Sequence, residues 1–248
     1  MSTDLAMIAE RLWRDYQARS PGTFFAEPQR SLDLAEAYWL QDAVRDIRVG
    51  RGDRIAGYKV GCTGPGTIAQ FGMAGPIRGC LFQSELRTSG ETLPSARFAN
   101  LAIEGEMAIR IGEDGLPIAG FPVIELHSFV FRGPQKTLVE LVANNGLNAG
   151  VVLPPEAEQV TTRNLATAST LEVHINGRLV GAGELWPLAG GMDASLKWLH
   201  EHLHQHGLKL SAGDLVLAGT PLGLYPVAAG DHIAVGLDGT VLVECRVA

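Results

Sequence analysis

The stretch LAIEGEMAIRIG, residues 101–112, alternates apolar side chains with Glu104 and Glu106. This period of two predicts a β-strand, because successive side chains of a strand point to opposite faces of its sheet. Ile103 and Met107 therefore belong to a core-facing side. The two glutamates share the other side, about 7 Å apart along the strand. A strand built for burial thus carries two negative charges on one face.

The same alternation extends along most of the chain after residue 55. IAGYKVGC is a short predicted strand, and TLEVHINGRLVGAG is a predicted hairpin around Asn176-Gly177. GLDGTVLVEC repeats the device at Asp238-Gly239. Asn-Gly and Asp-Gly pairs favour two-residue turns with positive φ, which join antiparallel strands. One helix, over residues 193–206, interrupts these strands, so the pattern predicts a mixed, mostly antiparallel β body.

The first fifty residues follow a helical period instead. Apolar residues recur at helical spacing over residues 4–18, and a second helix is predicted from Ser31 to about Ile47. The glycines of VGRGD end it. The sequence therefore predicts an α+β protein with an N-terminal helical arm over residues 1–50 and a β-rich catalytic domain over residues 51–248.

Composition excludes several classes of function. Twenty basic and 27 acidic side chains give a net charge of −7, and no Lys/Arg run is present, which disfavours binding to nucleic acid or to an anionic membrane surface. The N-terminus acquires charge too early for a signal peptide, and no apolar run approaches the ~20 residues of a membrane span. Three widely spaced cysteines make neither a disulfide framework nor a zinc motif. We expect a cytoplasmic protein.

Carboxylates in apolar segments are the first candidates for chemistry. An isolated carboxylate leaves water at high cost unless it is paired or binds a metal. Glu104 and Glu106 suit a hard divalent cation such as Mg²⁺ or Mn²⁺, although a strand with a polar outer face would read the same way. Glu125, in VIELHS, lies in a second apolar segment. These glutamates are candidates for a shared site.

Lysine, threonine and histidine side chains add further candidates. Lys59 lies in GYKVG, where it either extends to solvent or offers a cation and a proton donor. Thr220 ends the predicted strand LVLAGT as a turn residue or as a clamp for a carboxylate. His127 is expected to be a hydrogen-bonded structural residue, with a supporting role beside Glu125 left open. HEHLHQH, residues 200–206, is predicted to be a solvated helix face.

These stretches follow one another in a specific order. The order is YWLQD, GYKVGCT, the E-x-E strand, VIEL, NNGLNAGVVLP and LVLAGT. From about Ser31 to the C-terminus the chain resembles the hydratase/decarboxylase branch of the fumarylacetoacetate hydrolase superfamily. The resemblance implies β-sheets rolled around a site that is preceded by a helical arm. It also implies a homo-oligomer.

The resemblance assigns roles to residues of the motifs. It implies that Mg²⁺ or Mn²⁺ is held by Glu104, Glu106 and Glu125, that Lys59 lies beside a bound 2-oxo acid, and that Asn144 and Thr220 contact this substrate. A 2-oxo acid can chelate a divalent cation through its carboxylate and keto oxygens, and the cation then stabilises the developing enolate. Lys59 would act as proton donor or electrostatic partner.

The implied activity is hydration of a small 2-hydroxydienoate or 2-oxo-enoate to a 4-hydroxy-2-oxo acid. Decarboxylation of a 4-oxalocrotonate-like diacid is the nearest alternative, because the cation performs the same task in both reactions. Acylpyruvate hydrolysis, tautomerisation of a 2-oxo acid and non-catalytic binding of a metabolite also remain open at this point.

Overall fold

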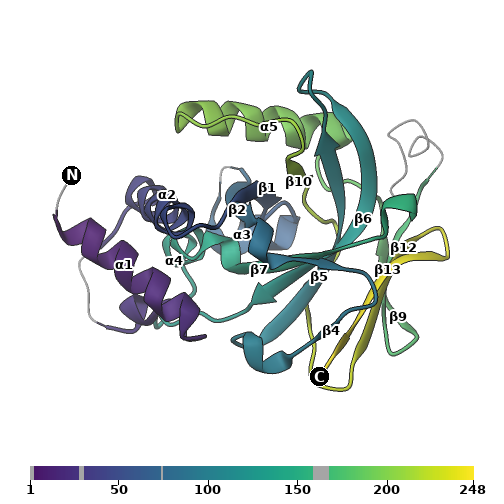
Figure 1. The fold of residues 1–248 in the computed structure, drawn as a ribbon, viewed down its shortest axis with the longest axis horizontal. Helices are drawn as coiled ribbons and strands as arrows, with labels where there is room; N and C mark the ends of the chain where they lie inside the picture. Colours follow the sequence, from purple (N-terminus) through teal and green to yellow (C-terminus); the bar gives the residue numbers. More distant parts are fainter. Residues whose placement is uncertain (1–2, 28–30, 74, 159–167) are drawn as a thin grey trace.

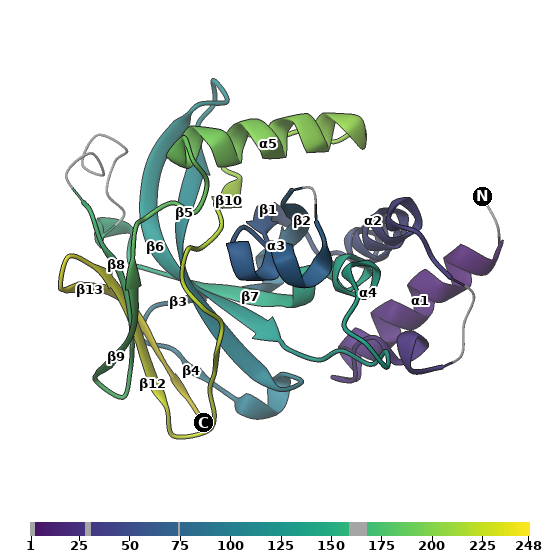
Figure 2. The same ribbon diagram turned by 180° about the vertical axis from the view of Figure 1, so that it is seen from behind.

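The computed structural model describes residues 3–27, 31–73, 75–158 and 168–248, and these form two β-sheets with helices packed around them (Figures 1 and 2). The helices are α1 (Thr3–Gln17), α2 (Leu34–Gly50), α3 (Pro65–Phe71), α4 (Leu138–Ala143) and α5 (Gly191–Gln205). The strands are β1 (Ile55–Gly61), β2 (Ile77–Phe82), β3 (Leu86–Thr88), β4 (Thr92–Leu93), β5 (Leu101–Ile111), β6 (Pro117–Ser128), β7 (Asn148–Leu153), β8 (Leu171–Ile175), β9 (Arg178–Gly183), β10 (Leu215–Leu217), β11 (Tyr225–Pro226), β12 (His232–Leu237) and β13 (Thr240–Val247). The predicted α+β class is confirmed.

The predicted helical arm is present as α1 and α2. The second helix begins with a capping box, in which the Asp33 side chain accepts a hydrogen bond from the Glu36 amide and the Glu36 carboxylate binds the Asp33 amide. Buried side chains of the arm share a core with Leu141 of α4, among them Leu12 and Leu40. The arm therefore packs on the β body, and its independence as a domain over residues 1–50 stays a prediction.

The larger sheet has the strand order β2-β1-β10-β5-β6-β7-β3, and β11 pairs with β5 outside this path. Its pairs are antiparallel except β1 with β10 and β3 with β7. The long antiparallel pair β5–β6 crosses the middle of the molecule (Figure 1). The predicted E-x-E strand is thus a central strand, with neighbours on both edges.

The smaller sheet has the order β4-β13-β12-β8-β9 and lies at the end of the molecule away from α1 (Figure 2). Its two tight hairpins are the predicted ones. Asn176 and Gly177 have φ values of 54° and 76°, and Asp238 and Gly239 have φ values of 47° and 81°. Positive φ at both central residues is the geometry that Asn-Gly and Asp-Gly accept at low cost.

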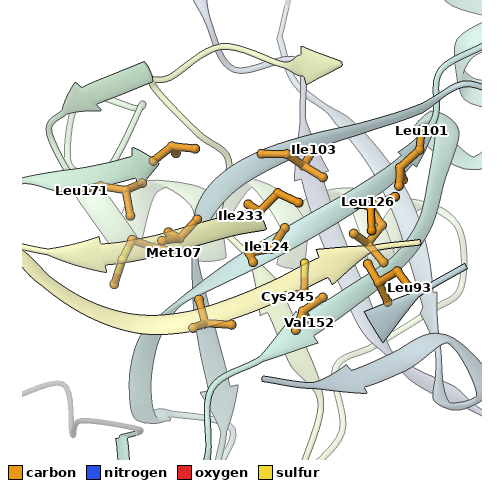
Figure 3. Close-up of a cluster of buried hydrophobic side chains, with 14 of the residues drawn as sticks. Leu93, Leu101, Ile103, Met107, Ile124, Leu126, Val152, Leu171, Ile233 and Cys245 are labelled. Carbon is orange, nitrogen blue, oxygen red and sulfur yellow. The ribbon is translucent and has the colours of Figure 1, made fainter. Parts of the chain in front are cut away.

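The main hydrophobic core lies between the two sheets. Ile103 and Met107 of β5 and Ile124 and Leu126 of β6 point into it together, and all four are fully buried (Figure 3). Because side chains alternate along a strand, the intervening residues of β5 and β6 face the opposite way. This second face, on the side of β1 and α3, carries the glutamates.

The histidine-rich helix differs from the expectation. His200 and His204 are exposed as predicted, but His202 and His206 are half-buried. The His202 ring lies 4.9 Å from the Trp198 ring and 4.7 Å from the Tyr38 ring, measured between centroids. The sequence gives no sign that α5 packs against α2, so the prediction of a fully solvated face was wrong. None of the described helices has the length and apolarity that crossing a bilayer requires.

Candidate active site

The register of β5 and β6 places two acidic residues, one from each strand, directly opposite each other. Glu104 pairs with Glu125 across the two strands, and Ala102 pairs with His127. Side chains of directly opposed residues in an antiparallel pair stand about 5 Å apart at their Cβ atoms. Glu104, Glu125 and His127 therefore rise from one face as neighbours.

These three side chains form a compact group of potential metal ligands. One ligand atom from each of Glu104, Glu125 and His127 lies within 4.8 Å of the others. His127 Nε2 is 3.3 Å from Glu104 Oε2 and 3.4 Å from Glu125 Oε2. This nitrogen is buried and lacks a hydrogen-bond partner of good geometry among the described residues. A buried nitrogen without a hydrogen-bond partner, beside two carboxylates, has the chemistry of a group that could hold a cation.

Glu106 lies deeper on the same face, at 2% exposure. One carboxylate oxygen, Oε1, accepts a hydrogen bond from the Gly219 amide, directly after β10. Burial raises the pKa of Glu106 well above its ordinary value, and the negative charges of Glu125 and Glu104 raise it further. The Lys59 charge opposes this rise but does not cancel it. The raised pKa favours the protonated form, so an ionised Glu106 needs further positive charge beside it.

Lys59 points into the protein rather than to solvent. Its side chain is 3% exposed, and Nζ lies 2.5 Å from Glu125 Oε1 and 3.2 Å from the Gly146 carbonyl oxygen. Burial lowers the pKa of Lys59, but the charges of Glu125 and Glu104 outweigh burial, so its pKa lies above the ordinary value. The lysine is accordingly a charged ammonium within the acidic cluster.

Two neighbouring groups respond to this lysine and to one another. Burial raises the pKa of Glu125, but Lys59 and His127 outweigh that effect and hold it far below the ordinary value. Burial lowers the pKa of His127, whereas the charge of Glu125 raises it, with a net rise to about 8. Within the chain alone, Glu125 is thus the paired carboxylate and Glu106 the uncompensated one.

Glycines make the space that Lys59 occupies. A Cβ atom at Gly79 of β2 would lie 2.9 Å from Lys59 Cγ and 2.9 Å from the Asn145 carbonyl oxygen. A Cβ atom at Gly146, where φ is 61°, would lie 3.0 Å from Lys59 Cε. All three distances are shorter than ordinary van der Waals contacts. These glycines therefore fix the path of the lysine side chain toward Glu125.

The asparagine segment contributes a residue that the sequence did not single out. Asn148 Nδ2 donates a hydrogen bond of 2.8 Å to Glu125 Oε1, the oxygen that Lys59 also contacts. Asn144, the predicted substrate contact, instead donates from Nδ2 to the Glu140 carbonyl oxygen at the end of α4. It is absent from the described residues that line the site cavity. The structure does not bring Asn144 to the acidic cluster.

Thr220 lies beside Glu106 and is 7% exposed. Its hydroxyl donates a hydrogen bond of 2.7 Å to the Gly105 carbonyl oxygen and accepts one of 3.1 Å from the Leu222 amide. The hydroxyl thus fixes the turn after β10 against β5. Thr220 also lines the cavity, and its contact with substrate stays a prediction.

A cavity of about 200 Å³ opens above these residues. Its polar floor includes Lys59, Glu104, Glu106, His127 and Thr220. Its walls include Phe71 of α3 and further apolar residues, Phe129, Phe131, Leu141 and Leu147. Polar groups that converge on an otherwise apolar cavity are typical of a site for a small ligand.

The charges of the floor fit a divalent cation. When Glu104, Glu106 and Glu125 are all ionised, as metal ligands are, and His127 is neutral, the Lys59 ammonium leaves two negative charges uncompensated, and Glu106 and Glu125 are 2% and 1% exposed. Such charge is stable in a protein interior when a cation neutralises it. Carboxylate oxygens are the ligands that Mg²⁺ and Mn²⁺ prefer. The donor set therefore suits one hard dication.

Known proteins of similar sequence and fold are consistent with this site. The family model described as fumarylacetoacetate (FAA) hydrolase C-terminal matches residues 75–248. A 2-keto-4-pentenoate hydratase of Paraburkholderia phymatum is 27% identical over 221 residues, which cover 84% of this chain and 80% of the relative. A 4-oxalocrotonate decarboxylase of Pseudomonas sp. (strain CF600) is 25% identical over 228 residues, 87% of this chain and 86% of the relative.

A solved structure shares the fold over nearly the whole chain. The 4-oxalocrotonate decarboxylase from Pseudomonas putida G7, complexed with magnesium and adipate, superposes with a TM-score of 0.86 at 22% sequence identity. The match covers 99% of this chain and 97% of that one. The predicted resemblance is therefore confirmed at the level of fold and family.

Proposed function

The chain belongs to the fumarylacetoacetate (FAA) hydrolase family, and from this premise we propose that it is a divalent-metal-dependent lyase. Its proposed substrate is a small 2-hydroxydienoic or 2-oxo-enoic acid, and its proposed reaction is hydration to a 4-hydroxy-2-oxo acid. The observation that carries the proposal is the cluster of three glutamates, His127 and Lys59, of which all except Glu125 line one small cavity. The relatives named as hydratases support hydration as the reaction.

We assign Glu104, Glu106 and Glu125 as the residues that would hold the cation, Mg²⁺ or Mn²⁺. When bound, such a cation supplies Lewis-acid stabilisation of negative charge that develops on the keto oxygen of a 2-oxo acid. His127 contacts both Glu104 and Glu125, so its proposed role is to align these carboxylates.

Lys59 is the proposed partner of the substrate. Its ammonium offsets the charge of the glutamates and attracts an anionic acid into the cavity. Because the pKa of Lys59 is raised, the group enters the reaction protonated and can donate a proton from Nζ to a developing carbanion. Glu125 and Asn148 hold this ammonium and its partner oxygen in place.

The remaining cavity residues have the proposed roles of binding the substrate and excluding water. Thr220 presents its hydroxyl at the polar end, and the aromatic wall encloses the carbon chain of the substrate. A polar floor under an apolar wall orients a molecule that has a 2-oxo acid head and a hydrocarbon tail.

Decarboxylation of a 4-oxalocrotonate-like diacid is the second candidate. Two of the similar proteins are named 4-oxalocrotonate decarboxylase, at 25% and 24% identity. Loss of CO₂ places negative charge on the same part of a 2-oxo acid as hydration does, so the same floor would serve it.

The test follows the ultraviolet absorption of 2-hydroxypenta-2,4-dienoate in the presence and absence of Mg²⁺ or Mn²⁺. We expect the band to decay only with metal, and the decay to stop in Glu106→Ala. Release of CO₂ from 4-oxalocrotonate, without decay of the dienoate band, would assign decarboxylation instead. If neither substrate reacts while both bind, the chain is a metabolite-binding protein and the proposed activity is wrong.

The expected homo-oligomer and cytoplasmic location remain predictions from the resemblance and the composition. The three cysteines are free in the structure. Light scattering on the purified protein tests the oligomeric state.

A further inference from the structure

A single lysine lies at the mouth of the site cavity, apart from the acidic floor. Lys136 is exposed and lines the cavity just before α4. Its Nζ atom is 4.9 Å from the centroid of the Phe129 ring and 5.4 Å from that of Phe131. Within residues 3–27, 31–73, 75–158 and 168–248, no ion pair or hydrogen bond engages this ammonium. Lys136 is thus an exposed cation beside the cavity, and its contacts among the described residues are with aromatic rings.

The wall between this lysine and the floor is aromatic. Phe129 and Phe131 meet edge to face at 5.9 Å between centroids, and Phe71 of α3 stacks on Phe131 at 6.3 Å. All three rings line the cavity. Apolar walls gain from burial of a hydrocarbon chain and offer nothing to a charged group, so they separate the polar floor from the mouth.

The chain itself leads from one charged region to the other. Every second residue from the end of β6 onward lines the cavity. These residues are His127 in β6 and, beyond its end, Phe129 and Phe131. His127 contacts Glu104 and Glu125, whereas Phe129 and Phe131 contact Lys136. A ligand that follows this wall meets the acidic floor first, then the rings, and finally the ammonium of Lys136.

We propose that Lys136 is the residue by which this site distinguishes dioic from monocarboxylic 2-oxo acids, because its ammonium binds a second carboxylate at the far end of the substrate. This inference rests on the proposed function, because the floor must hold the 2-oxo acid head. The rings hold the exposed ammonium beside the cavity by cation–π contact. A monocarboxylic acid with a hydrocarbon tail would leave this charge unpaired.

A matched pair of ligands tests the inference without turnover. Calorimetry in saturating Mg²⁺ compares 2-oxoadipate with 2-oxohexanoate, which has the same six carbons and lacks the terminal carboxylate. We expect 2-oxoadipate to bind at least about threefold more tightly, the upper range for a partly exposed ion pair. Lys136→Gln should bring the two affinities to within about twofold by weakening the dioic acid alone.

The control is Lys197→Gln, which removes another exposed lysine, on α5, that pairs with Glu201. This variant should leave both affinities unchanged. Equal binding of the two acids by the wild type, or equal weakening of both in Lys136→Gln, would overturn the role of Lys136 and leave the proposed function standing. Failure of both acids to bind in the presence of metal would overturn the proposed function and this inference together.

Discussion

Glu104 and Glu125 face each other directly across β5 and β6, and both contact His127 Nε2, at 3.3 Å and 3.4 Å. Two carboxylates in register across a buried strand pair repel each other unless a positive charge lies between them. Lys59 compensates Glu125 at 2.5 Å, and Glu106 is left with a raised pKa. The register of this one strand pair thus brings together carboxylates that a bound cation would stabilise.

Removal of the Lys59 ammonium separates catalysis from metal binding. In Lys59→Met we expect activity to fall by at least about 100-fold, because the proposed proton donor is lost. Cation affinity should stay equal or rise, since no ammonium then competes for Glu125. Without metal, the variant should lose up to about 3–5 kcal/mol of unfolding free energy, because buried Glu125 loses its ammonium partner and keeps only His127 and Asn148.

Added Mn²⁺ should restore most of that stability, and urea unfolding with and without Mn²⁺ measures the difference. Lys197→Met serves as the matched control, since its partner Glu201 is exposed. A Lys59→Met protein that is destabilised equally with and without Mn²⁺ would show that the cation and the lysine do not share Glu125.

A methyl group at Gly79 should displace the same lysine without altering any charge. In Gly79→Ala the new Cβ would lie 2.9 Å from Lys59 Cγ and from the Asn145 carbonyl oxygen. Such overpacking costs about 1–3 kcal/mol of unfolding free energy. It also shifts the Lys59 side chain, so activity should fall more than tenfold. Gly50→Ala, at the end of α2 with nothing within 4 Å of the new Cβ, should change neither quantity. Unchanged activity in Gly79→Ala would mean that the position of Lys59 does not matter.

The contact between α5 and α2 should make stability depend on pH. Burial, together with the charges of Arg78 and His206, lowers the pKa of His202 to about 4. The folded protein therefore keeps His202 neutral, while the unfolded chain binds a proton below its ordinary pKa of about 6.5. Stability is fully present above that pH and is lost as the pH falls from about 6.5 toward 4.

The groups that face His202 are Tyr38, Trp198, His206 and Arg78, with Asp42 paired to Arg78. His202→Gln should flatten the decline in unfolding free energy between pH 7 and pH 5. His200→Gln, which changes an exposed residue of the same helix, should not. An identical slope in the two variants would contradict the buried, neutral state of His202.

Two substitutions distinguish Glu106, a proposed metal ligand, from His127, which is proposed to align the ligands. Glu106→Gln should weaken Mn²⁺ binding by more than about 100-fold, since it removes a charged ligand. His127→Gln should weaken it by about tenfold, which is the scale of a residue that aligns a ligand. Calorimetric titration measures both variants. A larger loss in His127→Gln would make the histidine nitrogen the ligand in place of Glu106.

Much of the fold follows from local pattern in the sequence. The alternation in LAIEGEMAIRIG placed Ile103 and Met107 in the core and both glutamates on the other face, because the strand period is two. The Asn176-Gly177 and Asp238-Gly239 turns were predictable because only a few residue types accept positive φ at both positions. Glu125 joined the candidate site because a carboxylate in an apolar strand needs a reason to be there.

What the sequence did not reveal depends on contacts between distant segments. Asn148 gained its role from a hydrogen bond to Glu125, 23 positions away, and His202 became buried through contact with Tyr38 on α2. Asn144 lies four positions before Asn148, yet its side chain binds the end of α4 instead. No local period distinguishes these asparagines, because residues 145–147, all with positive φ, interrupt the regular structure between them.

Direct titration with Mn²⁺ tests the central claim, that the glutamates of β5 and β6 hold one divalent cation. We predict one Mn²⁺ per chain in the wild type and more than about 100-fold weaker binding in Glu104→Gln, whose partly exposed side chain makes folding of the variant straightforward. Glu201→Gln, on the exposed face of α5, should bind as the wild type does. Equal Mn²⁺ affinity in Glu104→Gln and the wild type, or no binding by either, would contradict the account.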